Sequence, residues 1–345
     1  MHRNNFDFLR LIFAIFVVLT HSFVLSGLGE NDWLSLSTSG RFGLSYIGVA
    51  SFFVISGYLI FQSAQRSKNL IDYFRKRILR IFPALIIVLI FTLILALVLY
   101  DGSGCILTNR SFKTYLPNNL SLFNIQMQID GVFQNNPYKP TINGCLWTLR
   151  YEFLFYILSA VFIFFRRNSF IKVSLIFLFV LLWFGRTFFI QELSVYGFYS
   201  IKGYDLLFLG TFYTSGALLA AFEINQKIKP LHIIIFSIFF ILTIFVKPLY
   251  YFHFVSFPLF VISFGAWSTT YVNNIGKSIG DLSYGIYIYG FPVQQTLLYY
   301  FNLNYLELFI YSLIITACFA YLSWHIIEKQ ALKLKKLYKP RSATS

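Results

Sequence analysis

Charged residues are few in this sequence, and acidic residues are the scarcest of them. Only 12% of the 345 residues are Asp, Glu, Lys or Arg, and 13 residues are acidic, whereas 57% are hydrophobic. A soluble globular domain carries about 25% charged residues, roughly twice this share. The composition therefore excludes an ordinary soluble domain and predicts an integral membrane protein.

Cysteine is rare as well, with three residues in the chain. Cys318 lies in a late apolar run, so at most one disulfide can form, between Cys105 and Cys145 of one polar loop. Two alternatives stay open for this pair, a bridge in an external loop or two free thiols. No His, Cys, Asp and Glu cluster has metal-ligand spacing, and no P-loop or dinucleotide fingerprint occurs. We expect neither a metal ion nor a permanently bound cofactor.

Long apolar runs recur along the whole chain. A helix needs roughly 20 mostly apolar residues to cross a bilayer, and the pattern predicts an all-α bundle of about ten transmembrane helices. The expected spans are residues 8–27, 44–63, 82–100, 146–165, 171–190, 204–222, 231–247, 250–268, 282–300 and 305–324. The first is expected to be retained, because it is longer than a cleaved signal and contains Arg10 and His21.

Basic residues give the chain a net charge of +15. They cluster between the apolar runs, where membrane orientation and contact with anionic lipids explain them, so nucleic-acid binding is not expected. Alternate connecting segments hold nineteen Lys and Arg residues, and the opposite set holds six. The positive-inside rule then places both termini and segment 66–80 in the cytoplasm and segment 101–145 outside. We expect one membrane domain over residues 1–330 and a basic cytoplasmic tail over 331–345.

Ionisable side chains inside membrane spans are costly, which makes them candidate functional residues. Arg10 and His21 stand eleven residues apart in the first span, which places them about 20° apart around a helix and roughly 16 Å apart along it. A histidine is suited to proton transfer near neutral pH, such as taking the proton of an attacking hydroxyl. The alternative is a structural His21 that hydrogen-bonds a neighbouring helix.

Two more motifs contain candidate residues. In FRKRILRIFP, Arg77 and Arg80 stand one turn apart before the third span, and their guanidinium forks suit phosphate groups, with ordinary membrane anchoring as the alternative. In NGCLWTLRYEFLFY, Glu152 stands in an apolar setting near the external face. It is a candidate base or a partner that orients His21, and a structural ion pair with Arg150 or another helix is the alternative.

Five separated motifs together resemble, in order, the acyltransferase family 3 of membrane proteins, from about residue 5 to residue 330. They are FDFLRLIFAIFVVLTHS, SFFVISGYLIF, RKRILRIFP, LWTLRYEFLFY and GDLSYGIYIYGFPV. The resemblance implies a membrane-bound O-acyltransferase of the bacterial inner membrane. Such an enzyme moves an acetyl or other short acyl group from cytoplasmic acyl-CoA to a hydroxyl of an extracytoplasmic carbohydrate, such as O-antigen or exopolysaccharide.

The resemblance also implies roles for single residues. The family's Arg-x10-His signature falls on Arg10 and His21, its Arg-x-x-Arg signature falls on Arg77 and Arg80, and its tryptophan-to-glutamate motif ends at Glu152. We therefore expect His21 and Glu152 to be catalytic, and the three arginines to bind acyl-CoA as a co-substrate. The residues leave open whether transfer is direct or passes through an acyl-histidine.

The chain departs from the family pattern at Gly290, where many relatives have a histidine. It also lacks the hydrolase-like domain appended in some relatives, so the membrane domain is expected to act alone or with a separate partner. The expected partners are acyl-CoA, membrane lipids and a carbohydrate acceptor, free or lipid-linked. A transporter or flippase of acylated glycans and a non-catalytic scaffold are the rival functions, although no paired inverted repeats favour the transporter.

Overall fold

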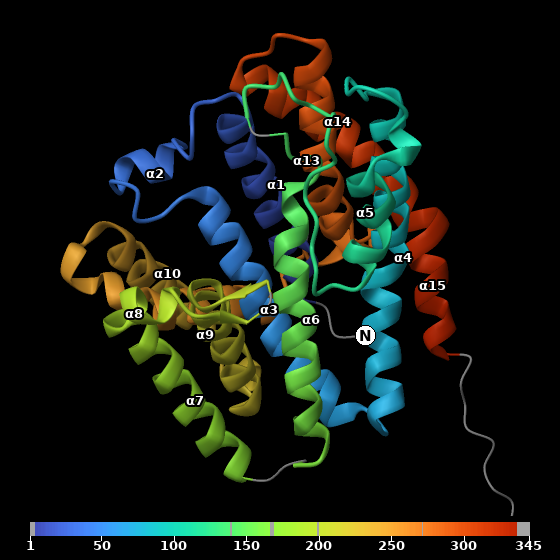
Figure 1. The fold of residues 1–345 in the computed structure, drawn as a ribbon. Coiled ribbons are helices and arrows are strands. Elements are labelled where there is room, and N and C mark those ends of the chain that lie inside the picture. Colours follow the sequence, from blue (N-terminus) through green and yellow to red (C-terminus); the bar gives the residue numbers. More distant parts are fainter. Residues whose placement is uncertain (1–3, 139, 166–168, 199, 271, 337–345) are drawn as a thin grey trace, which may run out of the picture.

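The computed structural model describes residues 4–138, 140–165, 169–198, 200–270 and 272–336, and the chain in them is almost entirely helical (Figure 1). The ten longer helices of the bundle are α1 (Phe6–Leu25), α3 (Leu44–Arg66), α4 (Leu70–Val98), α6 (Trp147–Ser159), α7 (Ser169–Phe188), α9 (Gly203–Ala221), α10 (Pro230–Phe245), α11 (His253–Ala266), α13 (Ser283–Tyr300) and α14 (Tyr305–Ser323). Each of the ten predicted spans therefore contains a helix.

Shorter elements connect or extend these helices. They are the helices α2 (Trp33–Ser37), α5 (Arg110–Leu120), α8 (Ile190–Ser194), α12 (Ile275–Ser278) and α15 (Lys329–Lys333), the 3-10 turns η1 (Ile106–Thr108), η2 (Gly144–Leu146), η3 (Ala160–Ile163), η4 (Ile224–Gln226), η5 (Lys247–Phe252), η6 (Val272–Asn274) and η8 (Leu334–Lys336), the π-helical turn η7 (Trp324–Glu328), and the antiparallel pair β1 (Gly197–Phe198) and β2 (Ile201–Lys202). The predicted tail continues α14 through η7, α15 and η8, and its residues 337–345 lie outside the described part.

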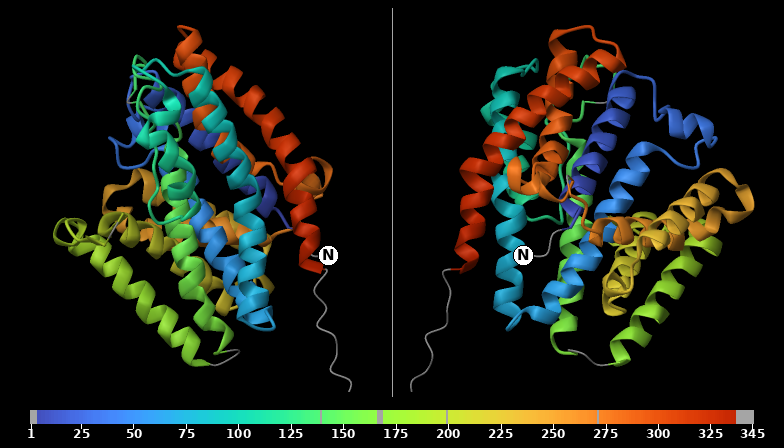
Figure 2. Two further views of the ribbon diagram at one scale, coloured as in Figure 1. Left: turned by 45° about the vertical axis from the view of Figure 1, so that its right-hand side comes forward. Right: turned by 180° about the vertical axis from the view of Figure 1, so that it is seen from behind.

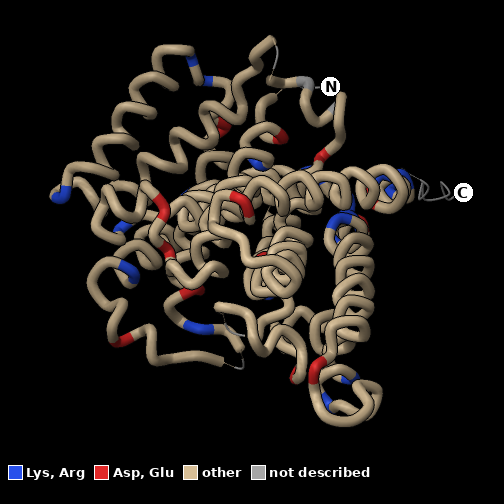
Figure 3. Tube along the Cα trace, turned by 90° about the horizontal axis from the view of Figure 1, so that it is seen from above, with Lys and Arg blue, Asp and Glu red and all other residues tan. Residues whose placement is uncertain are grey.

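Seven helical stretches of the described chain are long and apolar enough to cross a membrane. They are Phe6–Leu25, Leu44–Arg66, Leu70–Val98, Gly144–Ile163, Ser169–Phe188, Lys247–Ala266 and Tyr305–Lys333. Charged residues are sparse along the trace (Figure 3). The all-α bundle of a multi-pass membrane protein is thus confirmed, whereas the count of ten crossings, the orientation of the termini and the domain boundary at residue 330 stay predictions.

The third predicted span differs most from the structure. It is expected to begin at residue 82, but α4 begins at Leu70, where the side chain of Asn69 accepts a hydrogen bond from the backbone N–H of Asp72 at 2.9 Å. The polar segment before Pro83 is therefore the first part of the helix. Pro83 is tolerated inside it, as prolines in membrane helices often are. Arg77 and Arg80 consequently project from a helix and not from a loop.

Glycines allow the closest helix crossing of the bundle, between α3 and α9. A Cβ atom on Gly57 would lie 1.9 Å from the carbonyl oxygen of Tyr213, and one on Gly216 would lie 2.0 Å from that of Val54. The two backbones touch directly here, as small residues permit in membrane bundles. On its other side α3 packs against α1, which in turn packs against α13 (Figure 2). Helix α1 is thereby enclosed along both long faces.

Candidate active site

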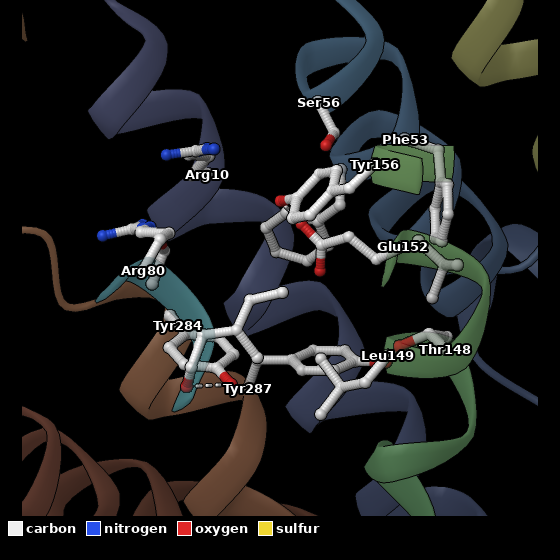
Figure 4. Close-up of a pocket in the computed structure, with 14 residues that line it drawn as sticks. Arg10, Phe53, Ser56, Arg80, Thr148, Leu149, Glu152, Tyr156, Tyr284 and Tyr287 are labelled. Carbon is white, nitrogen blue, oxygen red and sulfur yellow. Dashed lines mark hydrogen bonds between the residues drawn. The ribbon is translucent and has the colours of Figure 1, made fainter. Parts of the chain in front are cut away.

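A cavity open to solvent lies between α1, α3, α4, α6 and α13, and its empty space, counted with the solvent at its mouth, is about 680 Å³. Its wall is formed by Arg10, Val49, Phe52, Phe53, Ser56, Arg80, Ile81, Thr148, Leu149, Glu152, Tyr156, Ser283, Tyr284 and Tyr287. Figure 4 shows the two arginines on one side of the cavity and Thr148 with Leu149 on the other. The wall is therefore cationic at one end and apolar with hydroxyl groups at the other.

The cationic end contains two of the three arginines that the motifs single out. Arg10 of α1 and Arg80 of α4 both donate to one carboxylate oxygen of Asp281, at 3.4 and 2.5 Å. Arg77 does not line the cavity. It donates to Ser63 at 3.0 Å, and in the described part of the chain it has no carboxylate within ion-pair distance. The structure thus brings Arg10 and Arg80 together and leaves Arg77 apart from them, over the rings of Tyr73 and Tyr156 at 5.7 Å from each centroid.

Glu152 lies on the cavity wall and accepts a hydrogen bond from the hydroxyl of Tyr156, one helical turn later. Neither of its two predicted partners contacts it in the described chain. Arg150 donates to the backbone carbonyl of Ser200, and His21 contacts other groups. The pairing of Glu152 with His21 or with Arg150 is therefore not observed. Glu152 instead lines the same cavity as Arg10 and Arg80.

His21 lies near the end of α1, between the start of α6 and the middle of α13. Its Nδ1 atom is 3.8 Å from the sulfur of Cys145, and its ring stands edge-on to Phe291 with centroids 5.3 Å apart. Cys145 is buried, Cys105 is exposed, and both are free thiols. Of the two alternatives for these cysteines, the free thiols are confirmed. Cys145 is buried beside His21, whereas Cys105 is exposed in the loop.

His21 is not part of the cavity wall, but residues about one helical turn from its contacts Cys145 and Phe291 are. Thr148 and Tyr287 line the cavity, and their hydroxyl oxygens are 2.8 Å apart. Cys145 precedes Thr148 on one helix and Phe291 follows Tyr287 on the other, each by about one turn of ~5 Å. The Thr148–Tyr287 hydrogen bond therefore separates the cavity from the surroundings of His21 by about one helical turn.

A proline inside α13 leaves one backbone carbonyl of this continuous helix to be bound by the segment before α6. Pro292 has no N–H group, so the carbonyl of Ile288 loses its helical partner. The side chain of Asn143 donates to this carbonyl at 2.9 Å and accepts from the N–H of Cys145 at 3.1 Å. Gly144 completes the contact, because a Cβ atom there would lie 2.5 Å from the ring of Phe291. Asn143 thus joins the start of α6 to α13 beside His21.

Gln294 fixes α1 from the same helix. Its side-chain amide is fully buried and donates to the carbonyl of Val18 at 2.9 Å and to the hydroxyl of Ser22 at 2.8 Å. These two groups flank His21 on α1, so its backbone is held against α13. Sequence reasoning missed Gln294, Asn143 and Asp281, although all three belong to or adjoin the quoted motifs. Polar residues inside the ninth apolar span were the signal that could have identified Gln294.

Comparison with known proteins identifies the family of the chain. The chain matches the family described as "Acyltransferase domain" over residues 3–327. It is 30% identical to a protein named "O-acetyl transferase" from Shigella phage Sf6, over 96% of this chain and 97% of that protein. It is also 28% identical to "Nodulation protein 10" from Rhizobium leguminosarum bv. viciae, over 97% of this chain and 94% of that protein. No solved structure gives a significant match.

The family match covers all five motifs and the cavity that their helices enclose, from Arg10 on α1 to Tyr287 on α13. The match to the phage protein runs almost end to end in both chains. The chain therefore belongs to the acyltransferase family 3, and it is a multi-pass membrane acyltransferase.

Proposed function

We propose that this protein is an O-acyltransferase of the bacterial inner membrane that transfers an acetyl group from acyl-CoA to a hydroxyl of an extracytoplasmic carbohydrate. One observation carries the proposal: a single helix, α1, holds Arg10 on the cavity wall and His21 about one turn beyond the other end of that cavity. The name of the phage relative supports acetyl as the transferred group, and the nodulation relative is compatible with a carbohydrate acceptor.

The proposed topology has ten crossings with both termini in the cytoplasm. The basic segment between α3 and α4 lies at the opposite end of the bundle from the segment that follows α4 (Figure 1). The α3–α4 segment and the alternate segments that share its expected side of the membrane hold nineteen Lys and Arg residues, against six in the opposite set. This excess supports placing the end with the α3–α4 segment in the cytoplasm. On this topology Arg10 faces the cytoplasmic half and His21 faces the external half.

The donor is proposed to enter at the cytoplasmic end, with its phosphates near Arg77 and Lys335. Turn η8, which contains Lys335, packs against α4. Burial, together with the nearby charges of Arg80, Arg77 and Lys76, lowers the pKa of Lys335 to about 8. Cations held this close without enough acidic partners favour a polyanion. The narrow pantetheine arm would then extend through the cavity toward Thr148.

In the proposed reaction His21 accepts the proton of the acceptor hydroxyl as its oxygen attacks the thioester carbonyl carbon. The carbon–sulfur bond then breaks, and CoA leaves as the thiol after it takes up the proton from His21. The contact with Cys145 orients the imidazole ring in this scheme. Glu152 is the proposed second catalytic residue, because it is the acidic side chain of the cavity wall and lies between the arginine end and Thr148.

The proposal is tested by reconstituting the purified protein in lipid nanodiscs with acetyl-CoA labelled in the acetyl group and with glycans from the host membrane. We expect release of free CoA that depends on the glycan, together with label in an ester that mild base removes. In sealed vesicles that contain the same protein, a transporter or flippase of acylated glycans would instead move glycan across the bilayer without releasing CoA. That outcome would refute the enzyme proposal.

A further inference from the structure

Asp281 is the acidic residue at which three helices of the cavity meet. It precedes α13 and is 8% exposed. One carboxylate oxygen accepts from Arg80 at 2.5 Å and from Arg10 at 3.4 Å. The other accepts from the hydroxyl of Ser283 at 2.6 Å. Both oxygens are thus occupied, so the carboxylate is held in place by α13 and in turn holds groups of α1 and α4.

The two arginines need such a partner because of where they lie. Their side chains are each 20% exposed, and both line the cavity. A long guanidinium side chain loses considerable rotamer freedom when it is fixed in one orientation. A buried carboxylate that binds two of them at once fixes both orientations through one group. Since Asp281 carries one negative charge and its partners carry two positive charges, it offsets one of them, and Glu152 is the carboxylate that lines the same cavity.

Two other acidic residues adjoin this cluster without replacing Asp281. Asp7 and Glu328 lie close enough to interact electrostatically with Arg80 and Asp281. Neither forms an ion pair with the arginines in the described chain, where the pairs of Arg10 and Arg80 are both with Asp281. Glu328 instead accepts from the hydroxyl of Ser323 at 3.1 Å. The geometry of both guanidinium groups therefore depends on one carboxylate.

We infer that Asp281 is a positioning residue of the donor site. It holds Arg10 and Arg80 in the orientation that receives the thioester donor. This inference rests on the proposed function, because it assigns the arginines to acyl-CoA. Asp281 itself is not expected to touch the donor. Its role differs from that of a purely structural ion pair, because its loss should weaken donor binding more than it weakens the fold.

The test measures equilibrium binding of acetyl-CoA to the purified full-length protein in nanodiscs, together with KM and kcat. For Asp281→Asn we expect the Kd and KM for acetyl-CoA to rise about tenfold or more, which is at least ~1.4 kcal/mol, with a smaller change in kcat. Asp281→Glu, which keeps a carboxylate, should restore part of the affinity. Ser283→Ala should raise Kd two- to threefold, and it keeps the test valid if Asp281→Asn does not fold.

Asp205→Asn is the matched control. Asp205 is a partly buried carboxylate of α9 that accepts from the hydroxyl of Tyr151 at 3.0 Å, away from the cavity wall. It should leave the Kd for acetyl-CoA unchanged. An unchanged or tighter Kd in both Asp281→Asn and Ser283→Ala would overturn the inference while the proposed function stands. Absence of acetyl-CoA binding by the wild type would refute the proposed donor and this inference with it.

Discussion

Asn143 offers the sharpest test of how the surroundings of His21 are built. Its amide donates to the Ile288 carbonyl that Pro292 leaves without a helical partner, and its oxygen accepts from the N–H of Cys145. Both Asn143 and Ile288 are fully buried. In Asn143→Ala, the carbonyl and the N–H both lose their partners, and each buried unsatisfied group costs about 1–3 kcal/mol. We expect the free energy of unfolding to fall by about 2–5 kcal/mol.

A second substitution separates the two losses. Pro292→Ala returns an N–H group to α13 that can bond the carbonyl of Ile288 in the ordinary helical way. In that background Asn143→Ala should cost less, by about 1–2 kcal/mol, the size of coupling found between residues that share a partner. Unfolding is followed by titration of the purified protein with a denaturing detergent, for the wild type, both single variants and the double variant.

Activity provides an independent measurement for the same variants. Because Asn143 places Cys145 and the start of α6 against His21, we expect kcat of Asn143→Ala to fall about tenfold, which is ~1.4 kcal/mol of barrier. The Kd for acetyl-CoA should not change, because the arginine end of the cavity is untouched. Asn124→Ala, in the exposed part of the same loop, is the control. Equal costs of Asn143→Ala with and without Pro292 would refute the assigned hydrogen bond.

Three further predictions concern the cavity, its entrance and the helix crossing. Glu152→Gln should lower kcat at least about tenfold with little change in the amount of folded protein. A kcat equal to that of the wild type would show that Glu152 is not catalytic. The pKa of Lys335 is lowered to about 8, so this residue loses its positive charge as the pH rises through 8. The KM for acetyl-CoA should therefore rise between pH 7 and pH 9 in the wild type. In Lys335→Met the KM should no longer change with pH over this range. Gly216→Ala should abolish folded protein, since its Cβ atom would meet a backbone oxygen at 2.0 Å, whereas Gly210→Ala on the same helix meets side chains at 3.5 Å and should fold; detergent-phase size-exclusion chromatography checks both.

The helices were largely predictable because a bilayer leaves an apolar run of about 20 residues few alternatives to an α-helix. Even α13, which contains Gly285 and Pro292, lies where the apolar run predicts it. The beginning of α4 was not predictable in the same way. Its first turns are polar and basic, as a loop at the membrane surface would be, and only the cap at Asn69 marks them as helical.

The site was predictable only in part, for a different reason. Arg10 and His21 share one helix, so their spacing alone places both on one face. Asp281 lies 271 residues from Arg10, and Ile288 lies 145 residues from Asn143. Contacts between elements so far apart depend on how each helix is rotated in the bundle, which periodicity does not specify. The same rotation leaves Cys145 beside His21, whereas the contact of Glu152 with Tyr156 is local, one turn apart on α6.

Catalysis by His21 is tested most directly by mass spectrometry of surface glycans from cells that express the wild type, His21→Ala or His325→Ala at matched levels in the membrane. His325 is the control, because its ring hydrogen-bonds to the carbonyl of Tyr321 and lies against the ring of Tyr321 at the end of the last span, away from the cavity wall. We expect an added acetyl mass with the wild type and with His325→Ala, and none with His21→Ala. An acetylated glycan produced by His21→Ala at the wild-type level would contradict the proposed role of His21.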